Sequence, residues 1–300
     1  MSTGLPIELV LEIFRHASEI FVASDRASAV ALAKASRLAY TIVRPILLRR
    51  VAITDNNADA IDNLLLDTES AALILDFNIT TGDCDPMTLR IYNLTNIRCI
   101  RGIAVLVRKT IAQLPESGRA SLFKIQLWDA GMHPIPPLIT HLCLYSTAVD
   151  DASLPRILEC VNSTPSLTHL GCEFVVRTDS EGSLFQPETL VTCLRAILDA
   201  GGSQILQVAV RLCGHIVATD VLWDAYLMAL WAADIEEPSG NWAHRVHLWR
   251  DVRCFNDSSD DVAASIADGM AGVDVWSEAR PLQTLLADAD VAGEREERRL

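Results

Sequence analysis

The sequence predicts an α/β protein: a small helical module followed by an irregular array of strand–helix (βα) units. Residues 5–20 carry apolar side chains at the 3.6-residue spacing of a helix. Residues 137–142 and 165–170 share the pattern P-x-(I/L)-T-H-L, 28 residues apart, which indicates a recurring unit. Half of the residues are apolar and 21% are charged, so the chain can bury a large core. The expected regions are a helical module (1–54), the βα array (55–255), and an acidic loop, terminal helix and tail (256–300).

The first helix carries more apolar surface than one core requires. Pro6 suits its first turn, where a missing N–H costs little. At about 100° per residue, one face collects Ile7, Val10, Leu11, Phe14 and Ala17, and a second collects Leu5, Leu9, Ile13 and Ile20. The first face can pack on the domain's own core. The second face needs a partner, which is either the rest of this chain or another protein.

A second helical segment completes the module. Ser24 is a suitable N-cap, and apolar residues then continue at helical spacing to Val51. Many of these residues are alanine, so the segment forms only a small core. That core cannot cover both faces of the first helix.

The array is expected to contain one strand and one helix per unit. The 28-residue spacing lies within the range of leucine-rich repeats, about 20–29 residues, and residues 151–162 between the two strings suit a helix. Further strands are predicted at 72–77, 122–128, 205–212 and 245–252. One helix is predicted to start at Pro187 and to end just before Gly201, and another to open with Thr219 and Asp220. The favoured architecture is an irregular leucine-rich-repeat-like βα array; a two-layer α/β domain with a single sheet is the alternative.

Charge and hydropathy exclude several classes of function. The net charge is −14, and it is uneven: residues 1–54 hold seven basic and four acidic side chains, and the remainder holds 18 and 35. Such an acidic chain repels phosphate backbones, so no nucleic-acid partner is expected. No apolar run approaches the roughly 18 residues of a membrane-spanning helix, and the first residues lack the features of a secretory signal. We expect an intracellular protein, cytoplasmic or nuclear, that does not bind membranes.

Local sequence signatures give no catalytic residue, metal site or cofactor. The eight cysteines form no C-x-x-C pair, which favours buried free thiols. His244 and His247 are three residues apart in an expected strand, where they point to opposite faces. His141 and His169 occupy equivalent places in the repeated strings and are interpreted as repeat-surface residues. Nucleophile-elbow, phosphate-loop, dinucleotide and zinc-protease motifs are absent, so an enzyme is disfavoured, and a hydrolase with dispersed residues is a distant third class.

Residues 5–14 (LPIELVLEIF), 32–37 (LAKASR) and 43–51 (VRPILLRRV) resemble an F-box, in particular that of the expanded F-box families of mushroom-forming (basidiomycete) fungi. Residues 274–279 (DVWSEA) resemble a segment found near the end of fungal F-box proteins. The resemblance implies a Skp-type adaptor as partner and, through it, the cullin of a ubiquitin ligase. The adaptor-facing residues it implies are Leu5, Pro6, Leu9, Ile13, Pro45, Ile46 and Leu47.

The resemblance implies that the chain is a non-catalytic substrate-recognition subunit of a Skp-cullin-F-box type ubiquitin ligase, with an unknown protein client. Repeat geometry places client contacts on the strand side of the array, around Trp128, Tyr145, Glu173 and Arg211. The alternative is a protein-interaction module that does not engage a ubiquitin ligase.

Overall fold

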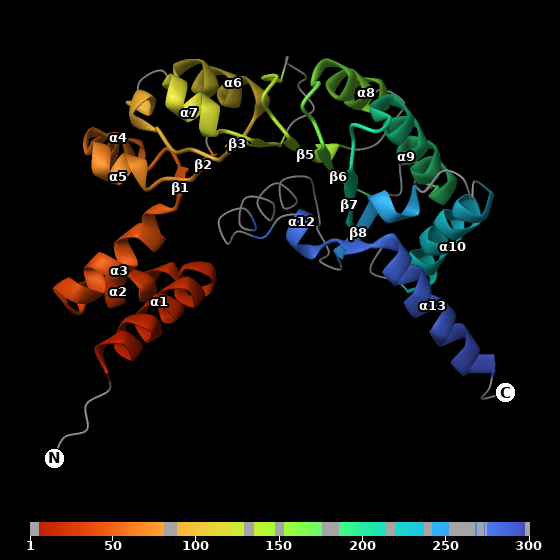
Figure 1. Cartoon of the computed structure of the whole chain (residues 1–300), viewed down its shortest axis with the longest axis horizontal. Coiled ribbons are helices and arrows are strands. Elements are labelled where there is room, and N and C mark those ends of the chain that lie inside the picture. Colours follow the sequence, from red (N-terminus) through yellow and green to blue (C-terminus); the bar gives the residue numbers. More distant parts are fainter. Residues whose placement is uncertain are drawn as a thin grey trace. The chain divides into compact units, whose positions relative to one another are not determined.

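The computed structural model describes residues 6–80, 89–128, 135–147, 153–175, 186–213, 220–236, 242–251, 268, 273 and 275–297. Two compact units make up the chain: residues 1–122 with 266–273, and residues 123–265 with 274–300. Both units contain helices and parallel strands (Figure 1), so the predicted α/β class is confirmed.

The first unit opens with three packed helices, α1 (Ile7–Ser24), α2 (Arg26–Lys34) and α3 (Arg37–Leu48). The predicted N-cap at Ser24 was wrong by one residue, because Ser24 ends α1 and Asp25 caps α2. The Asp25 carboxylate accepts hydrogen bonds from the backbone N–H groups of Ala27, at 3.1 Å, and Ser28. Ser36 caps α3 in the same way by accepting from the Ala39 N–H at 3.0 Å.

The core of these three helices is small, as the alanine content predicts. Its fully buried apolar side chains are Ala29, Ala33, Ala39 and Val43. One face of α1 covers this core. Methyl groups let the helices approach closely, but they leave little apolar area to bury any further face.

Short strands and helices continue the first unit: β1 (Arg50–Ile53), α4 (Ala58–Leu66), α5 (Thr68–Ala72), β2 (Asp76–Ile79), the 3₁₀ turn η2 (Ile91–Asn93), β3 (Cys99–Gly102), α6 (Ala104–Gln113) and α7 (Glu116–Ser121). The strands pair in parallel in chain order, with Val51 opposite Phe77 and Phe77 opposite Ile100. The strand predicted at 72–77 was placed too early, because the Asp67 side chain caps α5 and the chain is helical to Ala72.

The second unit continues the same alternation of strands and helices. Its elements are β4 (Lys124–Leu127), β5 (His141–Thr147), α8 (Ser153–Ser163), β6 (His169–Val175), α9 (Pro187–Gly201), β7 (Gln207–Cys213), α10 (Asp220–Glu236), η3 (Ala243–Arg245), β8 (Val246–Asp251), α12 (Val275–Glu278), β9 (Arg280–Pro281) and α13 (Leu282–Glu297). Strands β4 to β8 are parallel and adjacent in chain order, and β9 adds antiparallel to β8.

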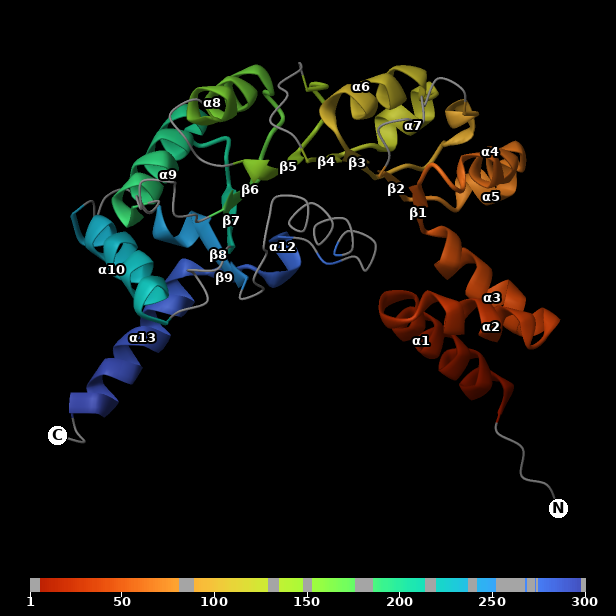
Figure 2. The same ribbon diagram turned by 180° about the vertical axis from the view of Figure 1, so that it is seen from behind.

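The two repeated strings become equivalent strands. His141 of β5 lies opposite His169 of β6, and His169 lies opposite Gln207 of β7. Helices α8 and α9 lie along one side of these strands and α12 lies on the other side, as Figures 1 and 2 show from opposite directions. Pairing in chain order with helices along one side is the arrangement of a repeat array.

Candidate protein-docking surface on the first helix

An apolar stripe runs along the outer surface of α1. Its members are Leu9, Ile13 and Ile20, which we call the docking stripe, and they are 51%, 56% and 54% exposed. Their spacing of four and seven residues places them within about 40° of one another around the helix axis. An uncovered patch at Leu5, Leu9 and Ile13 was expected from the surplus apolar surface of this helix. The exposure of Leu9 and Ile13 confirms it for these two residues, and Leu5 lies outside the described residues.

The opposite face of α1 packs against α2 and α3. Phe14 and Phe21 are partly buried there, and Ser18 is fully buried. The Ser18 hydroxyl donates a hydrogen bond to the Phe14 carbonyl at 2.5 Å, so this polar group is satisfied within its own helix. Ile7, which was expected on this inner face, is exposed in the first turn, but the face is packed from Val10 onward, and the docking stripe is a separate surface.

A charged strip borders the docking stripe. Arg15 Nε donates a hydrogen bond to Glu12 Oε2 at 3.1 Å, and Arg15 Nη1 lies 3.8 Å from Glu19 Oε1. The hydrogen bond from Arg15 lowers the pKa of the Glu12 carboxyl, so this edge keeps its charge. The docking stripe and the charged strip together give α1 an amphipathic outer surface. This pattern is typical of a helix that packs against a partner on its apolar side and is solvated on its charged side.

The remaining implied adaptor contacts are dispersed. Pro6 is exposed at the start of α1, and Leu5 lies outside the described residues. On α3, Pro45 is exposed, while Ile46 and Leu47 are half-buried and follow it at 100° steps around the axis. These three residues therefore do not share one face. Exposed Leu38, one heptad before Pro45, shares its face instead, and the helical wheel of α3 is the signal that would have found it.

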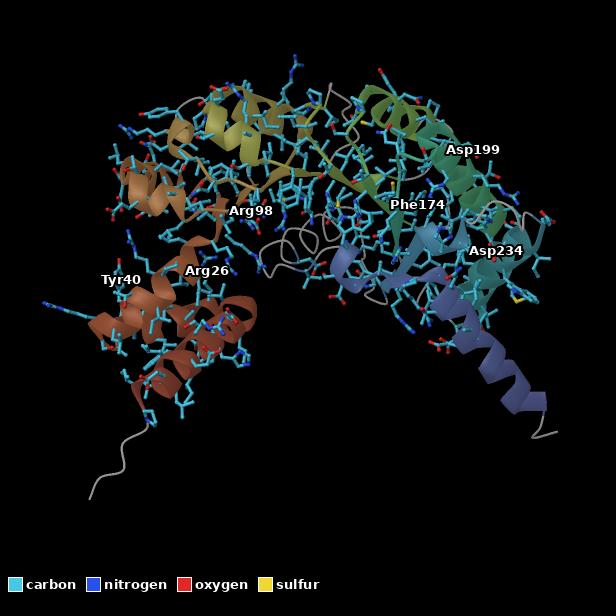
Figure 3. The ribbon with its side chains drawn as sticks, in the orientation of Figure 1. Arg26, Tyr40, Arg98, Phe174, Asp199 and Asp234 are labelled. Carbon is cyan, nitrogen blue, oxygen red and sulfur yellow. The ribbon has the colours of Figure 1, made fainter. Side chains whose placement is uncertain are left out.

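Arg26 of α2, labelled in Figure 3, joins its helix to α3 and to the first strand. Its Nη2 donates to the carbonyl of Leu47 at 2.9 Å and to that of Arg50 at 3.2 Å, and its Nη1 also donates to Arg50. Burial lowers the pKa of the Arg26 guanidinium. At the other side of α3, Arg44 Nη2 donates to Asp67 Oδ2 at 2.9 Å. The docking stripe is thereby carried on a module that is fastened to the βα units.

The predicted client contacts are buried in the second unit. Trp128, Tyr145, Glu173 and Arg211 are each at most 7% exposed. Arg211 bonds to Glu173 and Asp251, and its guanidinium lies 4.6 Å from the centre of the Trp249 ring. As placed, these four side chains stabilise the strand layer and offer no open surface to a client.

The described cysteines are buried free thiols. Cys99, Cys143, Cys160, Cys172, Cys193 and Cys213 are free and buried, as predicted; Cys84 and Cys254 lie outside the described residues. Burial raises the pKa of Cys160 to about 12 and also raises that of Cys172. Because the thiolate is the nucleophile, these groups are held in the inactive form.

A metal-binding cluster and a membrane-spanning helix are both absent from the described residues. Within them, no group of three or more His, Cys, Asp or Glu side chains is arranged to hold a metal ion. Among the helices described, none combines the length and the apolar character that crossing a membrane requires.

Comparison of the chain with protein-family models, with curated proteins and with solved structures gave no match.

Proposed function

We propose that this chain is the client-recognition subunit of a Skp-cullin-F-box type ubiquitin ligase, with α1 to α3 as its F-box. The observation that carries the proposal is the docking stripe. The F-box resemblance independently names Leu9 and Ile13 as adaptor-facing, and these are two of the three side chains in the stripe. Surface geometry and sequence pattern therefore point to the same residues.

The stripe is large enough to anchor a partner. Full burial of a leucine or isoleucine contributes about 1.5–3 kcal/mol, so covering the exposed half of each side chain contributes about 1 kcal/mol. Three such side chains contribute about 3 kcal/mol, which corresponds to roughly a hundredfold in affinity.

The proposed role requires no chemistry from the chain itself. A recognition subunit increases the rate by holding a client lysine near a charged ubiquitin-conjugating enzyme, which replaces a slow encounter with a positioned reaction. The raised pKa of Cys160 and Cys172 supports this reading, because a ubiquitin thioester would need a reactive thiolate.

A pull-down with a purified Skp-type adaptor tests the proposal. Wild type is compared with Leu9→Asp plus Ile13→Asp, which places two carboxylates in the stripe. The matched control is Leu66→Asp plus Val105→Asp, because these are also exposed apolar residues of the first unit but lie on α4 and α6. Circular dichroism verifies that each variant is folded.

We expect wild type and control to retain the adaptor and the stripe variant to lose it by at least tenfold. If folded wild type fails to bind the adaptor, the ligase proposal is wrong, and the chain is an interaction module outside a ligase. If the stripe variant binds as well as wild type, the adaptor contacts lie elsewhere.

A further inference from the structure

Trp276 of α12 rests on a pair of stacked histidines. The rings of His141 and His169 are parallel within 5° and their centres are 4.1 Å apart. The Trp276 ring meets both nearly at right angles, with its centre 5.4 Å from that of His169 and 6.1 Å from that of His141. Edge-to-face contacts at such distances are favourable between aromatic rings.

The polar end of the indole also has a partner. Trp276 Nε1–H donates a hydrogen bond to Cys143 Sγ at 3.2 Å. Cys143 lies two residues after His141 on β5, so both side chains project from the same face of the strand. Both contact α12, which lies on the side of the strands opposite α8 and α9 (Figure 1).

Gly171 provides room for the residue beside the tryptophan. A Cβ atom at position 171 would lie 2.7 Å from Val275 Cγ1 and 2.9 Å from Cys143 Sγ, closer than real atoms approach. Because glycine has no side chain, Val275 fits here and is only 2% exposed. We call the group His141, Cys143, His169 and Gly171 the indole seat.

The histidines of the indole seat are held in place by their neighbours. Thr140 Oγ1 lies 2.9 Å from His141 Nδ1, and Thr168 Oγ1 lies 2.8 Å from His169 Nδ1. Each hydroxyl also lies within hydrogen-bond distance of a backbone carbonyl, that of Phe123 for Thr140 and that of Thr140 for Thr168, so it can bond to either tautomer of the imidazole. Ring orientation is therefore fixed by the T-H pair of both repeated strings.

The segment in the seat is followed by only a short strand pairing and then by α13, which packs on α10 and β8 and buries Leu282. α12 is a single turn of four residues, and β9, which follows it, pairs only two residues with β8. Trp276 keeps part of its surface exposed. Side-chain contacts in the seat, and not a long strand pairing, hold the segment on the strands.

We infer that the indole seat is a recognition site for a tryptophan-bearing peptide segment, occupied in this chain by Val275 and Trp276. A protein partner that presents an indole beside a β-branched residue binds there by displacing Trp276. The tethered segment competes at an effective concentration in the millimolar range, so the unmodified chain binds such a partner weakly. The inference concerns a second site and stands whether or not α1 binds an adaptor.

Peptide binding in trans tests the inference. The probe is a fluorescein-labelled peptide with the sequence of residues 273–279 (VDVWSEA), titrated by fluorescence anisotropy into the full chain. In Trp276→Ala the place of the indole is vacant while Val275 remains, so we expect the peptide to bind at least tenfold more tightly than to wild type. The same peptide with alanine in place of tryptophan should not bind.

Matched variants locate the site. Trp231→Ala removes a partly exposed tryptophan from α10 and should behave like wild type. Adding His169→Ala to Trp276→Ala should return the peptide affinity to that of wild type, because the indole then loses one of its two edge-to-face partners. Trp276→Phe keeps an aromatic ring but has no N–H for Cys143, so its peptide affinity should lie between those of wild type and Trp276→Ala. This variant replaces Trp276→Ala in the test if Trp276→Ala is unfolded.

Two results would overturn the inference. Folded Trp276→Ala or Trp276→Phe that does not gain peptide binding would show that Trp276 is only a structural contact. Equal binding to wild type, Trp231→Ala and Trp276→Ala would show that the peptide binds at another place.

Discussion

Arg211 Nε of β7 donates a hydrogen bond to Asp251 Oδ2 of β8 over 2.9 Å, and both side chains are buried. Glu173 of β6 bonds to the same guanidinium, so one cation joins three neighbouring strands. Burial alone would lower the pKa of Arg211, but the nearby Glu173 and Asp251 carboxylates raise it, so the group stays charged. The ion group is one cation between two buried anions.

Arg211→Leu should strongly destabilise the chain. Removing the cation leaves two buried carboxylates without compensation, and breaking a buried pair in this way costs about 3–5 kcal/mol. Urea unfolding followed by circular dichroism measures the loss. The triple variant Glu173→Met, Arg211→Leu, Asp251→Leu removes all three charges and should recover most of it. If the triple variant is as unstable as the single one, the charges are not the cause.

Arg26→Met should loosen the connection between the helical module and β1. The guanidinium donates to the carbonyls of Leu47 and Arg50, and a hydrogen bond to a charged group contributes about 1.5–3 kcal/mol. We expect a loss of that size in urea unfolding, with faster hydrogen exchange in α2. Arg26→Lys is the control: it keeps the charge but cannot form the fork, so it should recover only part of the stability. Unchanged exchange in α2 would contradict this role.

Local patterns in the sequence predict the elements that are built from local interactions. The repeated strings indicated a recurring strand–helix unit, and β5 and β6 begin at equivalent histidines of these strings, His141 and His169; helix α9 begins at Pro187 as predicted. The helix stop is one residue later than expected, because Gly202, with φ of +51°, adopts the left-handed conformation that suits glycine after a helix. The outer apolar face of α1 was also visible from helical spacing alone.

Contacts between distant residues could not be predicted in the same way. Arg211 meets Glu173 and Asp251 across 38 and 40 residues of chain, and Trp276 reaches Cys143 across 133. No local pattern encodes such pairs. Glu173 and Arg211 were predicted as client contacts, but both are buried. Strand periodicity gives the face from which a side chain projects, but it does not tell whether another segment covers that face.

The stability of the second unit should fall as the pH drops below about 6.5. Burial lowers the pKa of His169, with a further contribution from His247, and burial also lowers that of His247. The folded state then binds fewer protons than the unfolded state, whose histidines titrate near 6.5, so stability is lost as pH falls and is level above that value. His141 stacks on His169, and Lys124 of β4 lies opposite His141.

Urea unfolding at pH 7.5, 6.0 and 5.0 measures this dependence. His169→Gln plus His247→Gln removes both titrating rings and should reduce the difference between pH 7.5 and pH 5.0. His244→Gln, which removes an exposed imidazole from η3, should leave that difference as it is in wild type. A pH dependence that survives the double substitution would have to arise from other groups.

Alanine substitutions should separate adaptor binding from stability within the helical module. Leu9→Ala, Ile13→Ala and Ile20→Ala each remove a side chain that is about half exposed, so unfolding should change little, while adaptor affinity should fall about fivefold for each lost kilocalorie of contact. Val43→Ala is the converse control. It removes two methyl groups from the buried core and should cost about 1–2 kcal/mol of stability, and it should not directly change adaptor binding by the folded chain.

Ile20 gives the sharpest readout, because it belongs to the docking stripe by geometry but was not among the contacts implied by the F-box resemblance. If Ile13→Ala weakens binding and Ile20→Ala does not, the adaptor covers only the first half of α1.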